Sequence, residues 1–367
     1  MSAGSAEDIR KAIRNCKAME TLKKFTYGLK KTKYMVFNTG REKEEVIEEE
    51  VKAGKVNKTE EYKYVGFNVD GKGNCQHHIR KKGKKIKGQV TAIKSIANYS
   101  NVGAAFVIVR LLLYVLCIIP SLLYAIEAWN KLTRKEIKML EQQQAKALCQ
   151  LMQLPRSTPY LGLLNEVGLC RIEEIIECRK AMLLQNILQS DDRRLCKRMI
   201  LDQKEEQEDG TFYMETKKIL GRYEVDIDEI ADMTKSKLKD RLKTKMKEKM
   251  TEHINKAADQ MKKLRFIQPG QFERQEYVKK LSGFACLETM KTRLNMLPVY
   301  GNFKADLTLE RLCPYCKAED DTTEHIIECT ELGRTSLTVD DLQNTNNQQT
   351  WTMINERVKF NLEHRAK

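Results

Sequence analysis

Residues Thr133–Gln153 read TRKEIKMLEQQQAKALCQLMQ, and this stretch has the pattern of a helix with one buried face. Thr133 and Glu136 have the spacing of a capping box, a motif that begins a helix. The apolar residues of the stripe are Ile137, Leu140, Ala147, Leu148 and Leu151. Because such a stripe packs against other helices, we predict a helix over 134–153 inside a helical core.

The neighbouring segments extend this helical pattern. Gly168 separates two further helical segments, 161–164 and 171–188. Residues 102–200 are the richest apolar region of the chain and predict a helical bundle. Together with the basic residues before it, this bundle forms a predicted domain over 71–200.

The composition supports a mainly α-helical fold. The chain has 367 residues, of which 41% are apolar, and this length suggests two or three structural units. Only 6 Pro and 18 Gly are present, which argues against a turn-rich all-β fold. There are 66 Lys plus Arg and 51 Asp plus Glu, a formal charge of +15. A basic excess of this size favours nucleic acid first and an anionic membrane second as partners.

The N-terminal 70 residues predict a small α+β piece. The pattern gives a helix over 6–25 that ends at Tyr27-Gly28, a strand over 34–37, and a strand over 62–69 followed by a turn at Asp70-Gly71. One helix and a few strands bury too little apolar surface to be stable alone. We therefore expect residues 1–70 to be the remnant of a larger domain.

The apolar run 111–126 resembles a membrane span but is too short for one. It has no charged residue over 16 positions, whereas a span needs about 20, and Pro120 would kink a helix there. We expect a buried core helix and no membrane contact. Residues 1–20 contain no apolar core of a signal peptide. An intracellular location, in the nucleus or the cytoplasm, is therefore expected.

Residues 71–100 are strongly basic. They contain eight Lys or Arg and no Asp or Glu. The core of the segment is Arg80, Lys81, Lys82, Lys84, Lys85 and Lys87. The segment is interpreted either as a solvated helix face, as a nuclear localisation signal, or as a surface that contacts nucleic-acid phosphates.

Residues 201–300 form a highly charged helical linker region. From Lys235 to Lys249 every second residue is Lys or Arg. Apolar residues follow i, i+4 spacing through the same segment: Leu238, Leu242, Met246, Met250 and Ile254. The segment 235–264 therefore predicts a long helix that is solvated, or that lies on nucleic acid, on a membrane surface, or against a protein partner.

One motif near the C-terminus predicts a metal site. Cys313, Cys316, His325 and Cys329 have the spacing C-x2-C-x8-H-x3-C. Three thiolates and an imidazole suit tetrahedral Zn²⁺, and a complete set of four protein ligands is typical of structural zinc. We predict a CCHC zinc knuckle over 301–335, followed by a polar tail over 336–367. The chain shows no P-loop, dinucleotide-binding or hydrolase motif, so no catalytic residue is predicted.

Five segments in order carry a resemblance to a known family. They are GLKKTKYMVF at 28–37, YKYVG at 62–66, IIPSLLYAIEAW at 118–129, LPRSTPY at 154–160 with EVGL at 166–169, and the knuckle at 313–329 with TEHII inside it. This ordered set resembles the C-terminal portion of a reverse transcriptase from a non-LTR (LINE-type) retrotransposon. The resemblance covers the end of the palm, the thumb and the zinc knuckle.

The resemblance implies an RNA or RNA–DNA hybrid partner. Residues 1–70 would be a palm and primer-grip remnant, in which Tyr64, Val65 and Gly66 position a primer end. Residues 71–200 would be thumb-like, with the cations of the basic segment on phosphates. Tyr315 would stack on template RNA or pack on the zinc site.

The chain departs from this family at the catalytic centre. The Y/F-x-D-D turn is missing, and Asp191-Asp192 follows Gln189-Ser190 beyond the thumb. Two-metal phosphoryl transfer needs those carboxylates, so Mg²⁺ is expected only if a complete palm is supplied upstream or in trans. We expect a truncated polymerase fragment that binds without catalysis. The alternative is a non-catalytic zinc-containing protein-interaction module derived from a retroelement, with 235–264 facing a partner.

Overall fold

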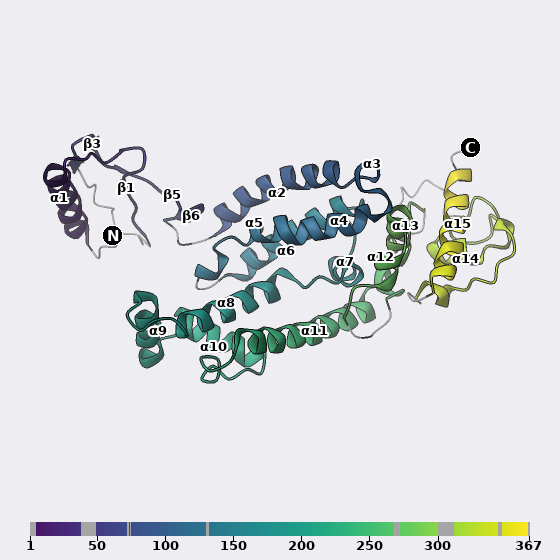
Figure 1. Cartoon of the computed structure of the whole chain (residues 1–367). Coiled ribbons are helices and arrows are strands. Elements are labelled where there is room, and N and C mark those ends of the chain that lie inside the picture. The colour runs from purple at the N-terminus through teal and green to yellow at the C-terminus, as the bar shows by residue number, and fades with distance from the viewer. Residues whose placement is uncertain are drawn as a thin grey trace. The chain divides into compact units, whose positions relative to one another are not determined.

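The computed structural model describes residues 5–37, 49–71, 73, 75–129, 132–267, 270, 272–299, 312–343 and 347–365. The chain divides into two compact units, residues 1–82 and 83–367. Helices dominate the described residues, and the strands are short and confined to the N-terminal unit (Figure 1). The predicted fold class, mainly α with a small N-terminal α+β piece, is confirmed.

The N-terminal unit packs one helix on short strand pairs. Its elements are α1 (Ala6–Lys23), β1 (Lys33–Tyr34), β2 (Glu50–Val51), β3 (Gly54–Lys55), β4 (Asn57–Lys58), β5 (Glu61–Tyr64) and β6 (Phe67–Asp70). β1 pairs in parallel with β4, whereas β2–β3 and β5–β6 are antiparallel. Ile13, Tyr34, Val51 and Val56 form the core between α1 and these strands.

Three local predictions for this unit are wrong. The strand predicted over 34–37 is only Lys33–Tyr34. Residues 62–69 are not one strand: β5 and β6 form a hairpin that reverses at Val65 and Gly66, whose φ angles are 45° and 84°. Two positive φ values in succession suit a tight hairpin turn, because they match the twist of the strands. The predicted first helix also ends early, with Lys24 in the left-handed conformation. Beyond this point, the Glu20 carboxylate accepts the backbone N–H of Tyr27.

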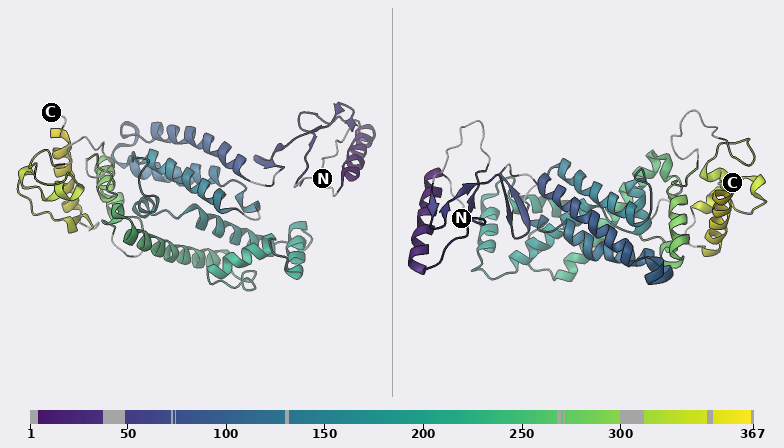
Figure 2. Two further views of the ribbon diagram at one scale, coloured as in Figure 1. Left: turned by 180° about the vertical axis from the view of Figure 1, so that it is seen from behind. Right: turned by 90° about the horizontal axis from the view of Figure 1, so that it is seen from above.

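The C-terminal unit is helical. Its helices are the end of α2 (Gln76–Ile96), α3 (Tyr99–Val102), α4 (Phe106–Leu113), α5 (Ile119–Leu122), α6 (Arg134–Leu151), α7 (Tyr160–Val167), α8 (Ile172–Leu188), α9 (Leu195–Glu206), α10 (Phe212–Arg222), α11 (Lys235–Gln260), α12 (Glu276–Lys280), α13 (Gly283–Arg293), α14 (Thr323–Glu328) and α15 (Gln348–Arg365). In this unit α8 packs against both α6 and α11 (Figures 1 and 2).

The helix predicted over 134–153 is α6. Both hydrogen bonds of its capping box are present: the Thr133 hydroxyl accepts the Glu136 N–H, and the Glu136 carboxylate accepts the Thr133 N–H. Leu140, Ala147, Leu148 and Leu151 are buried, whereas Ile137 is half-buried. The helix ends two residues before the predicted boundary, at Leu151, whose carbonyl accepts a hydrogen bond of 2.9 Å from the buried Arg110 guanidinium.

The apolar run of the sequence lies within a longer helical segment. Residues Tyr99–Leu122 are long and apolar enough to cross a membrane, and 39% of the most apolar window is buried inside the chain. The segment consists of α3, α4, a π-helical turn over Tyr114–Ile118, and α5. Phe106, Leu111, Tyr114 and Ile118 belong to the core. That the run does not contact a membrane stays a prediction.

The C-terminal residues, which the sequence predicts to be a polar tail over 336–367, contribute to a hydrophobic core. The helix α15 packs on α13 and α14. Trp351, Ile354 and Val358 are buried together with Ile326 and Ile327 of α14. Their i, i+3, i+7 spacing places them on one helix face, and polar residues between them lower the average hydropathy of the segment. The predicted boundary at residue 301 lies outside the described residues.

Candidate functional site

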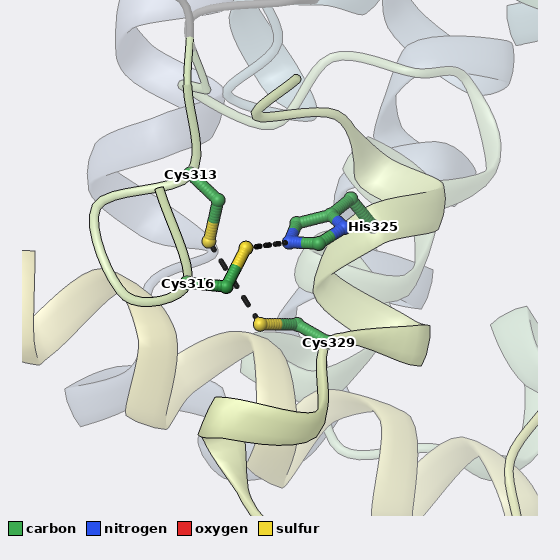
Figure 3. A group of neighbouring side chains, drawn as sticks. All are labelled: Cys313, Cys316, His325 and Cys329. Atoms are coloured by element: carbon green, nitrogen blue, oxygen red, sulfur yellow. Dashed lines mark hydrogen bonds between the residues drawn. The ribbon is translucent and has the colours of Figure 1, made fainter. Parts of the chain in front are cut away.

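The four predicted metal ligands lie together beside α14. Cys313 and Cys316 stand in a loop that the Cys313 N–H closes on the carbonyl of Glu319, at 2.7 Å. His325 lies on α14, whose N-cap Thr322 accepts the His325 N–H. Cys329 directly follows the helix. Figure 3 shows the three thiols and the imidazole pointing toward one point.

The distances between these side chains fit a tetrahedral ion. All four ligand atoms lie within 4.8 Å of one another. The Sγ atoms of Cys313 and Cys329 are 3.9 Å apart, and Cys316 Sγ is 3.2 Å from His325 Nε2 (Figure 3). A Zn–S bond of about 2.3 Å places two sulfurs of a tetrahedron roughly 3.8 Å apart. The cluster can therefore hold a metal ion such as zinc.

The thiols of the cluster differ in their protonation equilibria. Backbone N–H groups of Ala318 and Glu319 lower the pKa of Cys316 to about 7, the Ala318 group contributing most. Burial raises the pKa of Cys329 to about 11. A divalent cation binds thiolate rather than thiol, so a bound metal would offset the burial that opposes ionisation of Cys329.

Two neighbouring side chains support the cluster. Glu319 Oε2 lies 3.0 Å from His325 Nδ1, which leaves Nε2 to face the thiols. Arg357 of α15 donates to the carbonyls of Ile326 and Cys329. Such outer contacts orient metal ligands. The Arg357 contacts could not be predicted from the sequence, because about 30 residues separate Arg357 from its acceptors and no motif connects them.

Tyr315 lies between the two knuckle cysteines and contacts α15. Its hydroxyl donates to the carbonyl oxygen of Asn361 at 2.8 Å, and the residue is half-buried. This contact is with α15, and packing of the Tyr315 ring on the zinc site stays a prediction. Stacking on RNA stays a prediction.

The predicted phosphate-contacting residues lie on α2. Arg80, Lys81, Lys84, Lys85 and Lys87 are exposed, and Lys82 is half-buried. Ile79, Ile86, Val90 and Ile93 form the buried face of the same helix. We call the exposed side carrying these six cations the basic face of α2. The helix contains no Asp or Glu.

The hairpin residues Tyr64, Val65 and Gly66 lie at an exposed turn. Tyr64 is 66% exposed and Val65 is 70% exposed. The hairpin is attached to the first turns of α2 in the same unit: Lys81 pairs with Glu61, and the Phe67 ring lies 4.5 Å from the ring of His78. The structure thus brings the hairpin close to Lys81.

Acidification is expected to loosen this hairpin from α2. The Asn68 N–H donates to His78 Nδ1 at 3.1 Å, so His78 acts as a neutral acceptor. Burial, assisted by Lys82 and Lys81, lowers the pKa of His78 from 6.5 to about 4. Because the folded pKa is depressed, the stabilisation is present above pH 6.5 and is lost as the pH falls toward 4. The shift corresponds to about 3 kcal/mol.

Amide hydrogen exchange over 61–70, corrected for intrinsic rates, measures this loss between pH 7.5 and 4.5. His78→Gln keeps an acceptor that does not titrate, so protection in this variant should become less dependent on pH. His77→Gln changes the half-exposed neighbouring residue and serves as a control, so protection in this variant should keep the pH dependence that His78 causes. Equal pH dependence in His78→Gln and the unmodified chain would show that another group is responsible.

The apolar stripe of α11 packs inside the chain. Leu238, Leu242, Met250 and Ile254 are buried, and Met246 Sδ lies 2.9 Å from Cys178 Sγ of α8. Four of the eight alternating cations are in ion pairs: Arg241 with Glu229, Lys245 with Glu224, Lys247 with Glu273, and Lys249 with Glu177. That segment 235–264 faces a protein partner stays a prediction.

Comparison with known proteins adds no assignment. No protein-family model matches the chain, and searches of curated proteins and of solved structures give no match.

Proposed function

We propose that this chain binds RNA or an RNA–DNA hybrid without catalysing a reaction, and that the basic face of α2 contacts the phosphates. The carrying observation is that four of the six cations of this face have no competing carboxylate among the described residues. Within the part of the chain that the structure describes, Arg80, Lys84, Lys85 and Lys87 form no ion pair. Arg80, Lys84 and Lys87 follow i, i+4, i+7 spacing, so they form a row about 10 Å long. A row of unpaired cations of this kind suits a polyanionic strand.

The hairpin turn provides an exposed aromatic group in the same unit as Arg80 and Lys81. Tyr64 is exposed at the turn, and base stacking on an aromatic ring contributes about 1–3 kcal/mol per base. The resemblance to the palm end and thumb of a retroelement polymerase supports RNA or a hybrid over duplex DNA. The sequence contains no Y/F-x-D-D turn, so in this proposal Mg²⁺ has a role only with a complete palm from elsewhere.

The Cys3His cluster is proposed to hold a structural zinc ion. Its four protein donors complete a tetrahedron and leave no position for substrate. Cys313 and Cys329 are buried, which suits a role in folding rather than access by a reactant. In this role the ion stabilises the C-terminal module and supplies no reaction step.

The salt dependence of RNA binding tests the proposal. The triple variant Lys84→Ala, Lys85→Ala, Lys87→Ala is expected to lower the slope of log Kd against log salt concentration by about 2, since each phosphate contact on a single strand contributes about 0.7. The measurement is fluorescence anisotropy with a labelled RNA oligonucleotide at several salt concentrations.

A matched control removes the same charge elsewhere. Lys138, Lys146 and Lys256 are exposed on α6 and α11. Replacing these three by Ala should leave the slope nearly unchanged. Equal losses in both triple variants would mean that only net charge matters, and would reject the basic face of α2 as the site. Binding to a protein partner that salt does not weaken would favour the alternative of a protein-interaction module.

A further inference from the structure

A groove with apolar walls runs between α8 and α11. Its volume is about 730 Å³. Ile175, Cys178, Met182 and Leu183 of α8 line one wall, and Leu242 and Met246 of α11 line the other. Cys178, Met182 and Met246 also pack against the buried core beneath them. The groove floor is therefore continuous with the core, and the side chains that line it are held in place.

The rim of the groove is positively charged. Lys239 and Lys243 line it from α11, and both are exposed. They are one helical turn apart, so their ammonium groups extend from the same face. Neither lysine forms an ion pair with any residue in the described ranges. Glu127, the one carboxylate among the described residues of the lining, is paired with Arg179 at 3.1 Å.

We propose that this groove binds a long-chain aliphatic carboxylate. The hydrocarbon chain would lie along the walls formed by Met182, Leu183 and Met246, and the carboxylate would lie beside Lys239 and Lys243. The volume is within the range of about 300–1,000 Å³ that is typical of small-molecule sites. The unpaired lysines and the apolar walls match an anionic head and an apolar tail.

The lining suits an aliphatic ligand better than a nucleobase. A base needs donors and acceptors along its edge, whereas Asn186 is the single uncharged amide among the described residues of the lining. Burial of methylene groups contributes about 0.8 kcal/mol each, and this contribution needs no polar partner. The inference is independent of the proposed RNA binding, which uses α2.

Isothermal titration calorimetry of the full chain with dodecanoate, below its micelle-forming concentration, tests this site. Saturable binding of one dodecanoate per chain is expected. Lys239→Ala with Lys243→Ala should weaken dodecanoate binding about fivefold, the effect of losing an exposed charge pair. The control pair Lys138→Ala with Lys146→Ala should bind as the unmodified chain does.

Two further measurements separate the contribution of the carboxylate to binding from that of the hydrocarbon chain. Dodecanol should bind more weakly than dodecanoate to the unmodified chain, and equally well to the chain with and without the two groove lysines. Met182→Trp, checked for folding by circular dichroism, fills the groove and should abolish binding of both ligands.

Several results would overturn the proposal. The first is undiminished binding to Met182→Trp, which would locate the ligand elsewhere. The second is an equal loss in both lysine pairs, which would indicate general charge attraction. The third is a dimer in solution that Met182→Trp converts to monomer, which would identify a second copy of the chain as the occupant. Displacement of dodecanoate by uridine monophosphate at equal concentration would instead identify a nucleotide as the ligand of the groove.

Discussion

Cys329→Ser is expected to abolish stoichiometric zinc binding and to unfold the segment 312–343. The segment has a small core of its own, and a zinc ion held by four protein ligands can contribute about 10–16 kcal/mol in isolated zinc fingers. The buried Cys329 thiol is one of the two sulfurs that lie 3.9 Å apart, and a serine hydroxyl is a poor zinc ligand. Removing zinc from the unmodified chain with a chelator should have the same effect.

Hydrogen exchange and metal analysis measure this result together. Protection of the α14 amides should be lost, and α15 should become less protected, since Trp351 packs with Ile326 and Ile327. Cys196→Ser is the matched control, because Cys196 is exposed and remote in sequence from the cluster. Full protection of α14 in the metal-free chain would show that the module folds without an ion, and would reject the structural role.

Glu166→Gln is expected to destabilise the C-terminal unit by about 3–5 kcal/mol. Glu166 of α7 and Arg293 of α13 form an ion pair of 3.0 Å, and their side chains are 0% and 2% exposed. Tyr277 donates to the same carboxylate at 2.6 Å. Neutralising the glutamate leaves the guanidinium buried without its counter-charge, which is costly in a medium of low dielectric constant.

The pair also connects helices to the metal module. Arg293 donates to the carbonyls of Leu342 and Gln343, close to the core that contains Trp351. We expect the loss of Glu166 to reduce protection of α13, and to reduce protection of α15 as well. Urea unfolding provides the free energy of unfolding, and hydrogen exchange locates the loss.

Two variants control for the nature of this effect. Glu276→Gln removes a carboxylate from an exposed pair with Lys279, and should change stability little. The double variant Glu166→Leu with Arg293→Met removes both charges and should recover much of the loss. A loss in Glu276→Gln as large as in Glu166→Gln would contradict the assignment of the effect to burial of the ion pair.

Local patterns predicted the elements whose signals lie within one segment. The capping box at Thr133 and the i, i+4 stripe of α11 depend on neighbouring residues in a helix, so the sequence alone locates both helices. The knuckle is similar, because Cys313 to Cys329 span 17 positions and the loop and one helix turn bring the ligands together. Helix boundaries were less accurate: Lys24 ends its helix by adopting the left-handed conformation, and the carbonyl of Leu151 accepts a hydrogen bond from Arg110, 41 positions away.

The sequence by itself determined a mainly helical chain, a basic segment and a compact Cys3His motif, because periodicity, charge and ligand spacing are local properties. The tertiary structure alone decided which faces meet. It placed the stripe of α11 against α8, buried Trp351 of an apparently polar segment, and paired Glu166 with Arg293 across 127 positions. These contacts join residues that are distant in the chain, and their stability comes from excluding water between surfaces that no single segment contains.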